Sequence, residues 1–282
     1  MYTTLISPDD LKLLLDQHPD VVVVDTRHSL AATGWGREQY QVGHLPGAIY
    51  AHLDQDLSAP VIPGVTGRHP LPDAGTFNSW VSEHGIADDT QVIVYDQGGG
   101  SIAARLWWLL RWIGHDAVAV LDGGYPAWQH AGYAVTTEVL HPAPVRHTLR
   151  PHPEMTVLAD ELKSWCHDPA HRIVDSRAAK RYSGDEEPID PVAGHIPGAV
   201  NLPFAENLNA DGTWKSPDAL NMRFASLAET CHTDQIAFYC GSGVTACHNV
   251  LAFCHAGLGN ARLYPGSWSE WITDLGRGVE IS

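Results

Sequence analysis

The chain has 282 residues, of which 44% are hydrophobic and 18% are charged, so it is long enough for one large domain or two ordinary ones. Its 33 acidic and 17 basic residues give a formal net charge of -16, and so acidic a surface repels phosphate backbones and anionic lipids. We therefore expect no nucleic-acid partner and no membrane partner. No apolar stretch approaches the roughly 20 residues of a membrane span, and no signal-peptide pattern is visible.

The first half of the chain alternates predicted helices with short apolar strands. A helix over 9–18 leads into the strand VVVVD (21–25), and the run GHLPGAI (43–49) leads into another strand. A helix over 76–84 then precedes the strand QVIVYD (91–96). In the segment that follows, 101–114, the apolar residues fall on one helical face, which predicts an amphipathic helix ending at a glycine.

The second half repeats this plan. A helix is expected over 158–167 and another over 219–229, and three sequence matches occur in the same order in both halves. IVDSR (173–177) repeats VVDTR (23–27), GHIPGAV (194–200) repeats GHLPGAI (43–49), and IAFYC (236–240) repeats VIVYD (92–96), at offsets of 150, 151 and 144 residues. Matches at nearly constant spacing indicate duplication of a whole domain.

The duplication predicts an α/β protein with two tandem domains. Strands separated by helices favour a mostly parallel sheet flanked by helices in each copy. We place the first domain at 1–138 and the second at 155–282, joined by a proline-containing extended linker at 139–154. In such sheets, ligands bind beyond the carboxyl ends of the strands.

The run YCGSGVTAC (239–247) occupies that position in the second domain. Cys240 ends a predicted strand, and Gly241 and Gly243 permit a sharp turn before the next helix. Such a turn can aim several backbone N–H groups inward, so that they stabilise a thiolate or the outer sulfur of a persulfide. A packed cysteine in a glycine turn is the alternative.

Only one copy contains the cysteine. When the copies are aligned on the strand, Cys240 falls opposite Asp96 (240 minus 144). An aspartate cannot carry sulfur, so we expect the first domain to be catalytically silent. A cysteine phosphatase or arsenate reductase would need an arginine after five intervening residues, and that position is Ala246.

With these marks, the sequence resembles the tandem-domain rhodanese sulfurtransferases over essentially its whole length. The resemblance is carried by D-[ST]-R, GH-[LI]-PGA, the cysteine loop and the terminal GSWSEW (266–271). CGSGVT is similar to the loop of 3-mercaptopyruvate sulfurtransferases, whereas thiosulfate sulfurtransferases more often carry two bulkier, basic residues after the cysteine.

The resemblance implies a reaction in two half-steps. Cys240 takes sulfur from 3-mercaptopyruvate, forms a persulfide and passes the sulfur to a thiol, cyanide or a thioredoxin-type protein. Thiosulfate is the alternative donor, and a non-catalytic sulfur-carrier or scaffold module is a further alternative. No cofactor and no metal are implied. The odd number of cysteines, five, argues against a disulfide framework and favours a reducing, cytoplasmic compartment.

The resemblance also implies roles for individual residues, which are assigned by their positions in this sequence. The resemblance implies that Ser242, His69 and Asp54 act with Cys240 as the catalytic group, as a relay assisting proton transfer. From the residues alone, Asp54 reads as a turn or capping residue and His69 as a loop residue before a proline. Cys247 could form a disulfide with Cys240 under oxidation, although a small buried helix residue is the favoured interpretation.

The resemblance implies substrate binding at Arg181, which alone would be interpreted as a surface arginine, and at the loop residues Gly241, Gly243, Val244 and Thr245. A guanidinium suits a planar carboxylate because it can donate two parallel hydrogen bonds. In the family, a second arginine usually follows, where this chain has Ile189. The clamp is therefore single, or its second cation comes from elsewhere.

Two further pairs recur in both copies, and we interpret them as structural. Arg27 and Arg177 each follow a strand-end aspartate, which predicts an ion pair or loop anchor. His44 and His195 belong to the GH-[LI]-PGA runs and are expected to fix the loop before the next strand.

Overall fold

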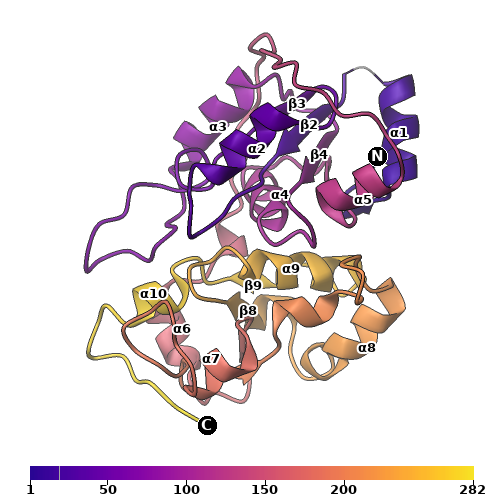
Figure 1. Ribbon diagram of the computed structural model, residues 1–282. Coiled ribbons are helices and arrows are strands. Elements are labelled where there is room, and N and C mark those ends of the chain that lie inside the picture. Colours follow the sequence, from indigo (N-terminus) through magenta and orange to yellow (C-terminus); the bar gives the residue numbers. More distant parts are fainter. Residues whose placement is uncertain (19) are drawn as a thin grey trace. The chain divides into compact units, whose positions relative to one another are not determined.

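The computed structural model describes residues 1–18 and 20–282, and Figure 1 shows its helices and strands. Two compact α/β units are present. Unit 1 comprises 1–59, 72–152 and 210–214, and unit 2 comprises 60–71, 153–209 and 215–282. The two short segments 60–71 and 210–214 therefore belong to the opposite unit from the one that chain order suggests. The domain limits placed at 138 and 155 stay a prediction.

Unit 1 contains a five-stranded sheet in the order β1-β5-β4-β2-β3, with every strand pair parallel. Its elements are β1 (Leu5–Ile6), α1 (Pro8–Gln17), β2 (Val22–Asp25), α2 (Trp35–Val42), β3 (Ala48–Tyr50), α3 (Ala74–Glu83), β4 (Val92–Tyr95), α4 (Ala103–Trp112), β5 (Val118–Leu121) and α5 (Gly124–His130). The parallel sheet predicted from the alternation of strands and helices is confirmed.

Unit 2 contains a four-stranded parallel sheet in the order β7-β6-β8-β9. Its elements are η1 (Pro153–Met155), α6 (Ala159–Trp165), β6 (Arg172–Asp175), α7 (Ala179–Ser183), β7 (Val200–Asn201), η2 (Phe204–Asn207), α8 (Pro217–Ala228), η3 (Thr233–Gln235), β8 (Ile236–Tyr239), α9 (Ala246–His255), β9 (Arg262–Leu263) and α10 (Ser267–Trp271). β6 and β8 pair over four residues each, so the duplicated strand pair β2–β4 of unit 1 has its counterpart here.

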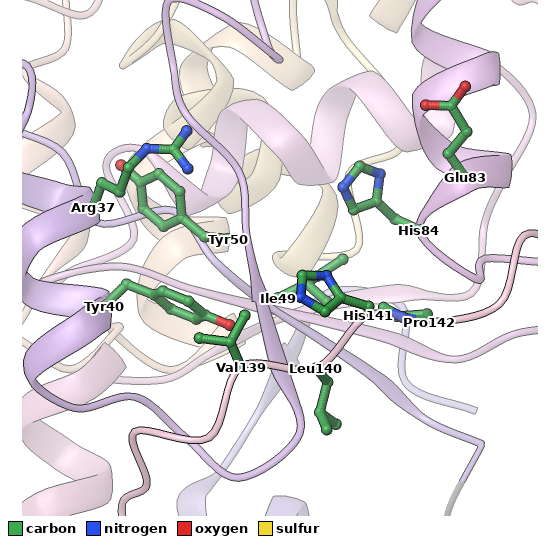
Figure 2. A pocket seen from close by; sticks show the side chains of 10 residues that line it. All are labelled: Arg37, Tyr40, Ile49, Tyr50, Glu83, His84, Val139, Leu140, His141 and Pro142. Carbon is green, nitrogen blue, oxygen red and sulfur yellow. The ribbon is translucent and has the colours of Figure 1, made fainter.

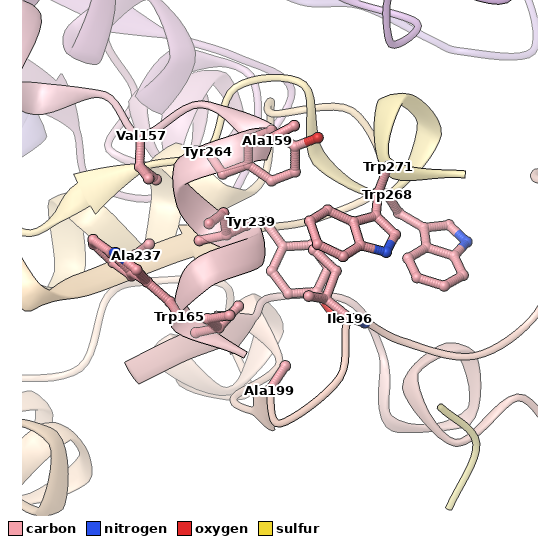
Figure 3. Packing of buried hydrophobic residues seen from close by; sticks show 12 residues of the cluster. Val157, Ala159, Trp165, Ile196, Ala199, Ala237, Tyr239, Tyr264, Trp268 and Trp271 are labelled. Carbon is pink, nitrogen blue, oxygen red and sulfur yellow. Dashed lines mark hydrogen bonds between the residues drawn. The ribbon is translucent and has the colours of Figure 1, made fainter. Parts of the chain in front are cut away.

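Both cores combine aliphatic and aromatic residues. All four residues of β4, β5 and β8 are buried, as expected for parallel strands covered on both faces. On one face of the unit 2 sheet, Trp165, Trp268 and Trp271 pack with Tyr239 and Tyr264 (Figure 3). Such large aromatic side chains contribute much of the apolar area that folding removes from water.

The helix α4 differs from the amphipathic helix predicted from its periodicity. Every residue from Ala103 to Leu110 is buried, including Arg105. A helix that is buried on all sides has no exposed polar face. The apolar stripe in the sequence therefore predicted less burial of α4 than the structure shows. None of the helices in the described part of the chain has the length and apolarity needed to span a bilayer.

The recurring arginines and histidines make the same contacts in both units. Arg27 forms a buried ion pair with Asp25 and donates to the carbonyl of Gly43, and Arg177 does the same with Asp175 and Gly194. His44 stacks on Tyr40, and His195 stacks on Tyr182, with ring centroids 3.9 and 3.8 Å apart. These contacts confirm the predicted ion pairs and join distant loops within each unit.

The segment predicted as a linker contains no helix or strand from 137 to 152 but is held against unit 1. The N–H of Val145 donates to the Ser82 carbonyl, and that of Arg150 donates to the Ile113 carbonyl. An extended backbone can be well anchored when its hydrogen bonds go to neighbouring elements.

Candidate active site

The loop carrying Cys240 connects the carboxyl end of β8 to the start of α9. Cys240 is 1% exposed, and its sulfur accepts a hydrogen bond from the N–H of Gly243, with N and Sγ 3.2 Å apart. Its own N–H donates to Oγ of Ser267. The cysteine therefore lies where ligands bind in parallel α/β sheets, as the sequence predicted.

Neighbouring residues of the terminal motif GSWSEW shape this loop. The N–H groups of Trp268 and Ser269 donate to the carbonyls of Cys240 and Gly241. Gly243 has a φ of +78°, and a Cβ there would lie 2.2 Å from the carbonyl oxygen of Pro265. Only glycine fits this position, because both the backbone conformation and the close approach exclude a side chain.

The equivalent loop of unit 1 contains a carboxylate in place of the sulfur. Asp96 is fully buried, and its two oxygens accept hydrogen bonds from the N–H groups of Gly98, Gly100, Ile102 and Ala103 at 2.8–3.2 Å. Burial raises the pKa of Asp96, and these four N–H groups oppose that rise. The unit 1 loop is thus an anion-binding nest occupied by a side chain of its own.

Counted from the strand-end residue, as 98, 100 and 102 are from Asp96, the corresponding residues of unit 2 are Ser242, Val244 and Ala246, and α9 begins one residue sooner after Cys240 than α4 does after Asp96. Within the described residues, these three N–H groups have no acceptor in the protein. The nest around Cys240 therefore contains N–H donors that the cysteine does not use, and these donors can bind an anion.

The predicted partners Ser242 and His69 are brought together. Oγ of Ser242 and Nδ1 of His69 are 2.7 Å apart, and both residues are buried. The tautomer of His69 decides which group donates the proton. His69 reaches this position because the segment 60–71 belongs to unit 2.

Asp54 lies in unit 1, beside two histidines. Its Oδ2 is 3.9 Å from Nε2 of His28 and 4.0 Å from Nδ1 of His52. The possible ligand atoms of these three residues all lie within 4.8 Å of one another, so the set could hold a metal ion. However, Nδ1 of His52 already accepts the backbone N–H of Asp54, so a metal at that nitrogen would have to displace this hydrogen bond.

Arg181 lies on α7 and is bound by two buried carboxylates. Its Nε and Nη2 donate to Glu187, and Nη2 also donates to Asp190, 3.0 Å away. Glu187 in turn pairs with Arg177. A guanidinium held by two buried partners has a fixed orientation, so Arg181 is positioned before any ligand binds.

Sequence reasoning missed Arg68. Its Nη1 forms an ion pair with Asp190, on the opposite oxygen from Arg181, and its backbone N–H donates to Ser269. Burial lowers the pKa of Arg68, and a Cys240 thiolate opposes that change. The only signal in the sequence was its place beside His69 in GRHPLP; nothing local connects it with the cysteine loop.

The remaining predicted binding residues form the loop itself. Gly241 adjoins the guanidiniums of Arg68 and Arg181, Val244 is buried, and Thr245 directly precedes α9. Cys247 donates through its sulfur to the carbonyl of Gly243, and all five cysteines are free thiols.

A pocket of about 230 Å³ lies in unit 1 and is shown in Figure 2. Tyr40, Tyr50 and His84 line it together with residues of the extended segment, among them His141. None of the predicted site residues contributes to it.

Comparison with known proteins places the chain in a family. A family model described as the rhodanese-like domain matches residues 7–131 and 158–274. The chain is 47% identical over 262 residues, covering 93% of it and 92% of the relative, to a protein of Pseudomonas aeruginosa named "Probable 3-mercaptopyruvate sulfurtransferase". It is 35% identical over 261 residues, covering 90% and 86%, to the thiosulfate sulfurtransferase of Rattus norvegicus.

A solved structure supports the same assignment. The 3-mercaptopyruvate sulfurtransferase from Leishmania major superimposes with a TM-score of 0.83 at 32% identity, covering 95% of this chain and 74% of that one. The chain therefore belongs to the family of proteins built from rhodanese-like domains, and it contains two tandem copies.

Proposed function

We propose that this protein is a sulfurtransferase that moves sulfur from 3-mercaptopyruvate, through a persulfide on Cys240, to a thiol acceptor. The names of its relatives support the reaction class, since they include both 3-mercaptopyruvate and thiosulfate sulfurtransferases. The observation that carries the proposal is the nest around Cys240, whose N–H groups at Ser242, Val244 and Ala246 have no protein acceptor among the described residues.

The comparison between the two loops supports an anionic sulfur in this nest. In unit 1, the N–H groups at corresponding positions bind both oxygens of Asp96. A persulfide extends one sulfur beyond Cys240, as a carboxylate extends beyond its Cβ, and its outer sulfur is anionic. The same donors would stabilise negative charge on that sulfur. With Asp96 in its nest, unit 1 has no nucleophile there, and we propose that it is catalytically silent.

In the first half-reaction, the Cys240 thiolate attacks the sulfur of 3-mercaptopyruvate. The new S–S bond forms as the C–S bond breaks, and its electron pair leaves with pyruvate as the enolate. The enolate takes one proton and becomes pyruvate, and Cys240 retains the persulfide. In the second half-reaction, a thiol, cyanide or a thioredoxin-type protein attacks the outer sulfur and releases the Cys240 thiolate.

We propose that Ser242 and His69 supply the proton. The hydroxyl of Ser242 lies on the nucleophile loop and is hydrogen-bonded to His69, so it can donate to the enolate and be reprotonated by the imidazole. We propose that Asp54 assists the histidine, by the resemblance to the family alone.

The proposal also specifies the sulfur donor and the cellular compartment. Thiosulfate is the competing donor, and the loop supplies no cation of its own for its two charges. Five free thiols fit a reducing, cytoplasmic compartment and a thiol acceptor. The net charge of -16 argues against nucleic-acid and membrane partners.

A donor competition tests the proposal. We would measure kcat/KM for 3-mercaptopyruvate and for thiosulfate with cyanide as acceptor, and detect the persulfide by intact mass after incubation with donor alone. Wild type should prefer 3-mercaptopyruvate and gain one sulfur atom. Cys240→Ser should do neither, whereas Cys254→Ser, a matched cysteine variant at the end of α9, should behave as wild type.

Each outcome has a separate meaning. Equal activity in Cys240→Ser would reject the persulfide mechanism. A clear preference for thiosulfate would keep Cys240 as the nucleophile and assign the alternative donor. No sulfur transfer from either donor, with a folded wild-type protein, would favour the carrier or scaffold function.

A further inference from the structure

We propose that His28, His52 and Asp54 form a binding site for a divalent transition-metal ion such as Zn²⁺ at the carboxyl edge of the unit 1 sheet. The ligand atoms would be Nε2 of His28, Nδ1 of His52 and Oδ2 of Asp54, all of which lie in unit 1. The site does not depend on the proposed sulfur-transfer function. The sequence did not indicate it, because its residues follow different strands.

Two neighbouring strands bring the histidines together. β2 and β3 pair in parallel (Figure 1), and His28 follows β2 whereas His52 follows β3. The carboxyl ends of parallel strands meet at one edge of a sheet, where ligands bind in folds of this class. The two imidazole rings pack edge to face there, with their centroids 5.3 Å apart.

The His28 ring has no hydrogen bond to compensate for its burial. Its side chain is 1% exposed, and neither Nδ1 nor Nε2 has a hydrogen-bond partner in the part of the chain that the structure describes. Buried polar groups nearly always have a partner, because an unsatisfied one costs stability. Nε2 lies 3.9 Å from Oδ2 of Asp54, which is too far for a hydrogen bond. A metal ion between these two atoms would bind both.

The hydrogen bonds of His52 select the nitrogen that would bind the metal. Nε2 of His52 lies 3.0 Å from the carbonyl oxygen of Thr33, so Nε2 carries the proton and Nδ1 is an acceptor. Nδ1 lies 4.0 Å from Oδ2 of Asp54. Metal-binding histidines usually donate their other ring N–H to a carbonyl or carboxylate in this way. His52 therefore already has the tautomer that metal binding at Nδ1 requires.

The three ligand atoms lie close to the spacing of a metal site, within 4.8 Å of one another. Zn²⁺ binds nitrogen and oxygen at about 2.0–2.2 Å, so its tetrahedral ligands lie about 3.3 Å apart. Asp54 can move to shorten the distances, because its side chain is 37% exposed. Its backbone N–H now donates to Nδ1 of His52 in a partly buried position, and would donate to water when the metal binds.

Two imidazoles and one carboxylate favour a transition metal over Mg²⁺ or Ca²⁺. Neutral imidazole suits Zn²⁺, Cu²⁺, Ni²⁺ and iron, whereas Mg²⁺ and Ca²⁺ prefer oxygen ligands. Three protein ligands leave one tetrahedral position for water. The bound ion would join the loop after β2 to the loop after β3, and would stabilise the folded state because the unfolded chain has no such site.

Isothermal titration with Zn²⁺ tests the site in the whole chain, after accessible thiols have been blocked with iodoacetamide so that cysteines do not compete. The proteins compared are wild type, His28→Phe, Asp54→Asn and His130→Phe, the last of which replaces an exposed histidine on α5 as a matched control. We expect the affinity for Zn²⁺ to fall at least about 10-fold in His28→Phe and Asp54→Asn, since loss of even an outer-shell partner typically costs that much. His130→Phe should bind as wild type does.

Co²⁺ binding to the unmodified proteins gives a second readout. The visible spectrum of bound Co²⁺ contains sulfur-to-metal charge transfer when a thiolate is a ligand, and lacks it when all ligands are nitrogen and oxygen. We expect a spectrum of nitrogen and oxygen ligands in wild type and His130→Phe, and its loss in His28→Phe. If His28→Phe does not fold, Asp54→Asn, at a partly exposed position, replaces it.

Three results would overturn the site. The first is a wild-type protein that binds no Zn²⁺, and the second is an equal affinity for Zn²⁺ in all four proteins. The third is a Co²⁺ spectrum of thiolate ligands that neither His28→Phe nor Asp54→Asn changes, which would place the metal at cysteines instead.

Discussion

Oγ of Ser242 lies 2.7 Å from Nδ1 of His69, although the two residues are 173 positions apart in the chain. The contact forms because the segment 60–71 leaves the first half of the sequence and packs with unit 2. Both residues are buried, so water competes little for this hydrogen bond. The pair can therefore act as one unit beside the nucleophile.

The double variant of this pair should be no worse than either single variant. Ser242→Ala and His69→Ala should each lower kcat with 3-mercaptopyruvate about 100-fold, since each interrupts the same proton path to the enolate. Steady-state kinetics of the two single variants and the double variant measure the coupling. Thiosulfate leaves no enolate to protonate, so its turnover should fall less.

The matched control for this cycle is Ser226→Ala, an exposed serine on α8, which should be indistinguishable from wild type. Additive losses in the double variant would show that Ser242 and His69 act independently and would remove the relay.

Replacing Asp96 by asparagine should destabilise unit 1. Its carboxylate accepts four backbone N–H groups in a fully buried loop. An asparagine would turn an NH₂ group toward donors and leave them unsatisfied, at a cost of about 1–3 kcal/mol in the free energy of unfolding. Urea titration measures this loss, with the exposed Asp16→Asn as control. An unchanged stability would mean that the nest does not depend on a carboxylate.

Much of the fold could be predicted because the sequence contains the same order of strands and helices twice. Recurring strand-end motifs identified β2, β4, β6 and β8, and the glycine turn after β8 indicated a nest at Cys240. These are local patterns of apolar runs and turn residues, which can be recognised directly in the sequence. Short helices such as α2 and α5 were not predicted, because a few residues of mixed polarity show no clear hydrophobic periodicity.

The cation next to the cysteine loop could not be predicted for a different reason. Arg68 contacts residues that are far from it in the sequence, because the segment 60–71 of the first half packs with unit 2. Nothing in GRHPLP marks an arginine as a partner of Asp190. The resemblance to the family implies a second arginine where this chain has Ile189.

The carboxyl of Glu270, on α10, should make stability depend on pH. Burial raises its pKa above the ordinary value of 4.5, and Arg277 opposes the rise. A raised pKa means that the folded state binds the proton more tightly than the unfolded state, so this group costs stability as pH rises above 4.5 through the folded pKa. The substitution Glu270→Gln removes this titrating carboxyl and keeps a side chain of nearly the same shape.

The free energy of unfolding of Glu270→Gln relative to wild type should therefore increase as the pH rises above 4.5 and level off once the pH exceeds the raised pKa of Glu270 in the folded state. Urea titrations of both proteins across that range measure the difference, from which other titrating groups cancel. A difference that stays constant with pH, or that shifts in favour of wild type, would contradict the raised pKa.

Substituting Gly241 by alanine should weaken the binding of 3-mercaptopyruvate. The backbone of Gly241 does not have the positive φ that requires glycine, but a Cβ there would lie only 2.8 Å from Nη2 of Arg68. The flexible end of that side chain can move away, so we expect little change in the melting temperature and a KM for 3-mercaptopyruvate raised about tenfold. In the Arg68→Met background, where the guanidinium is gone, the same alanine should have no further effect on KM. A Gly241→Ala loss of equal size in both backgrounds would show that alanine disturbs the nucleophile loop itself and does not act through Arg68.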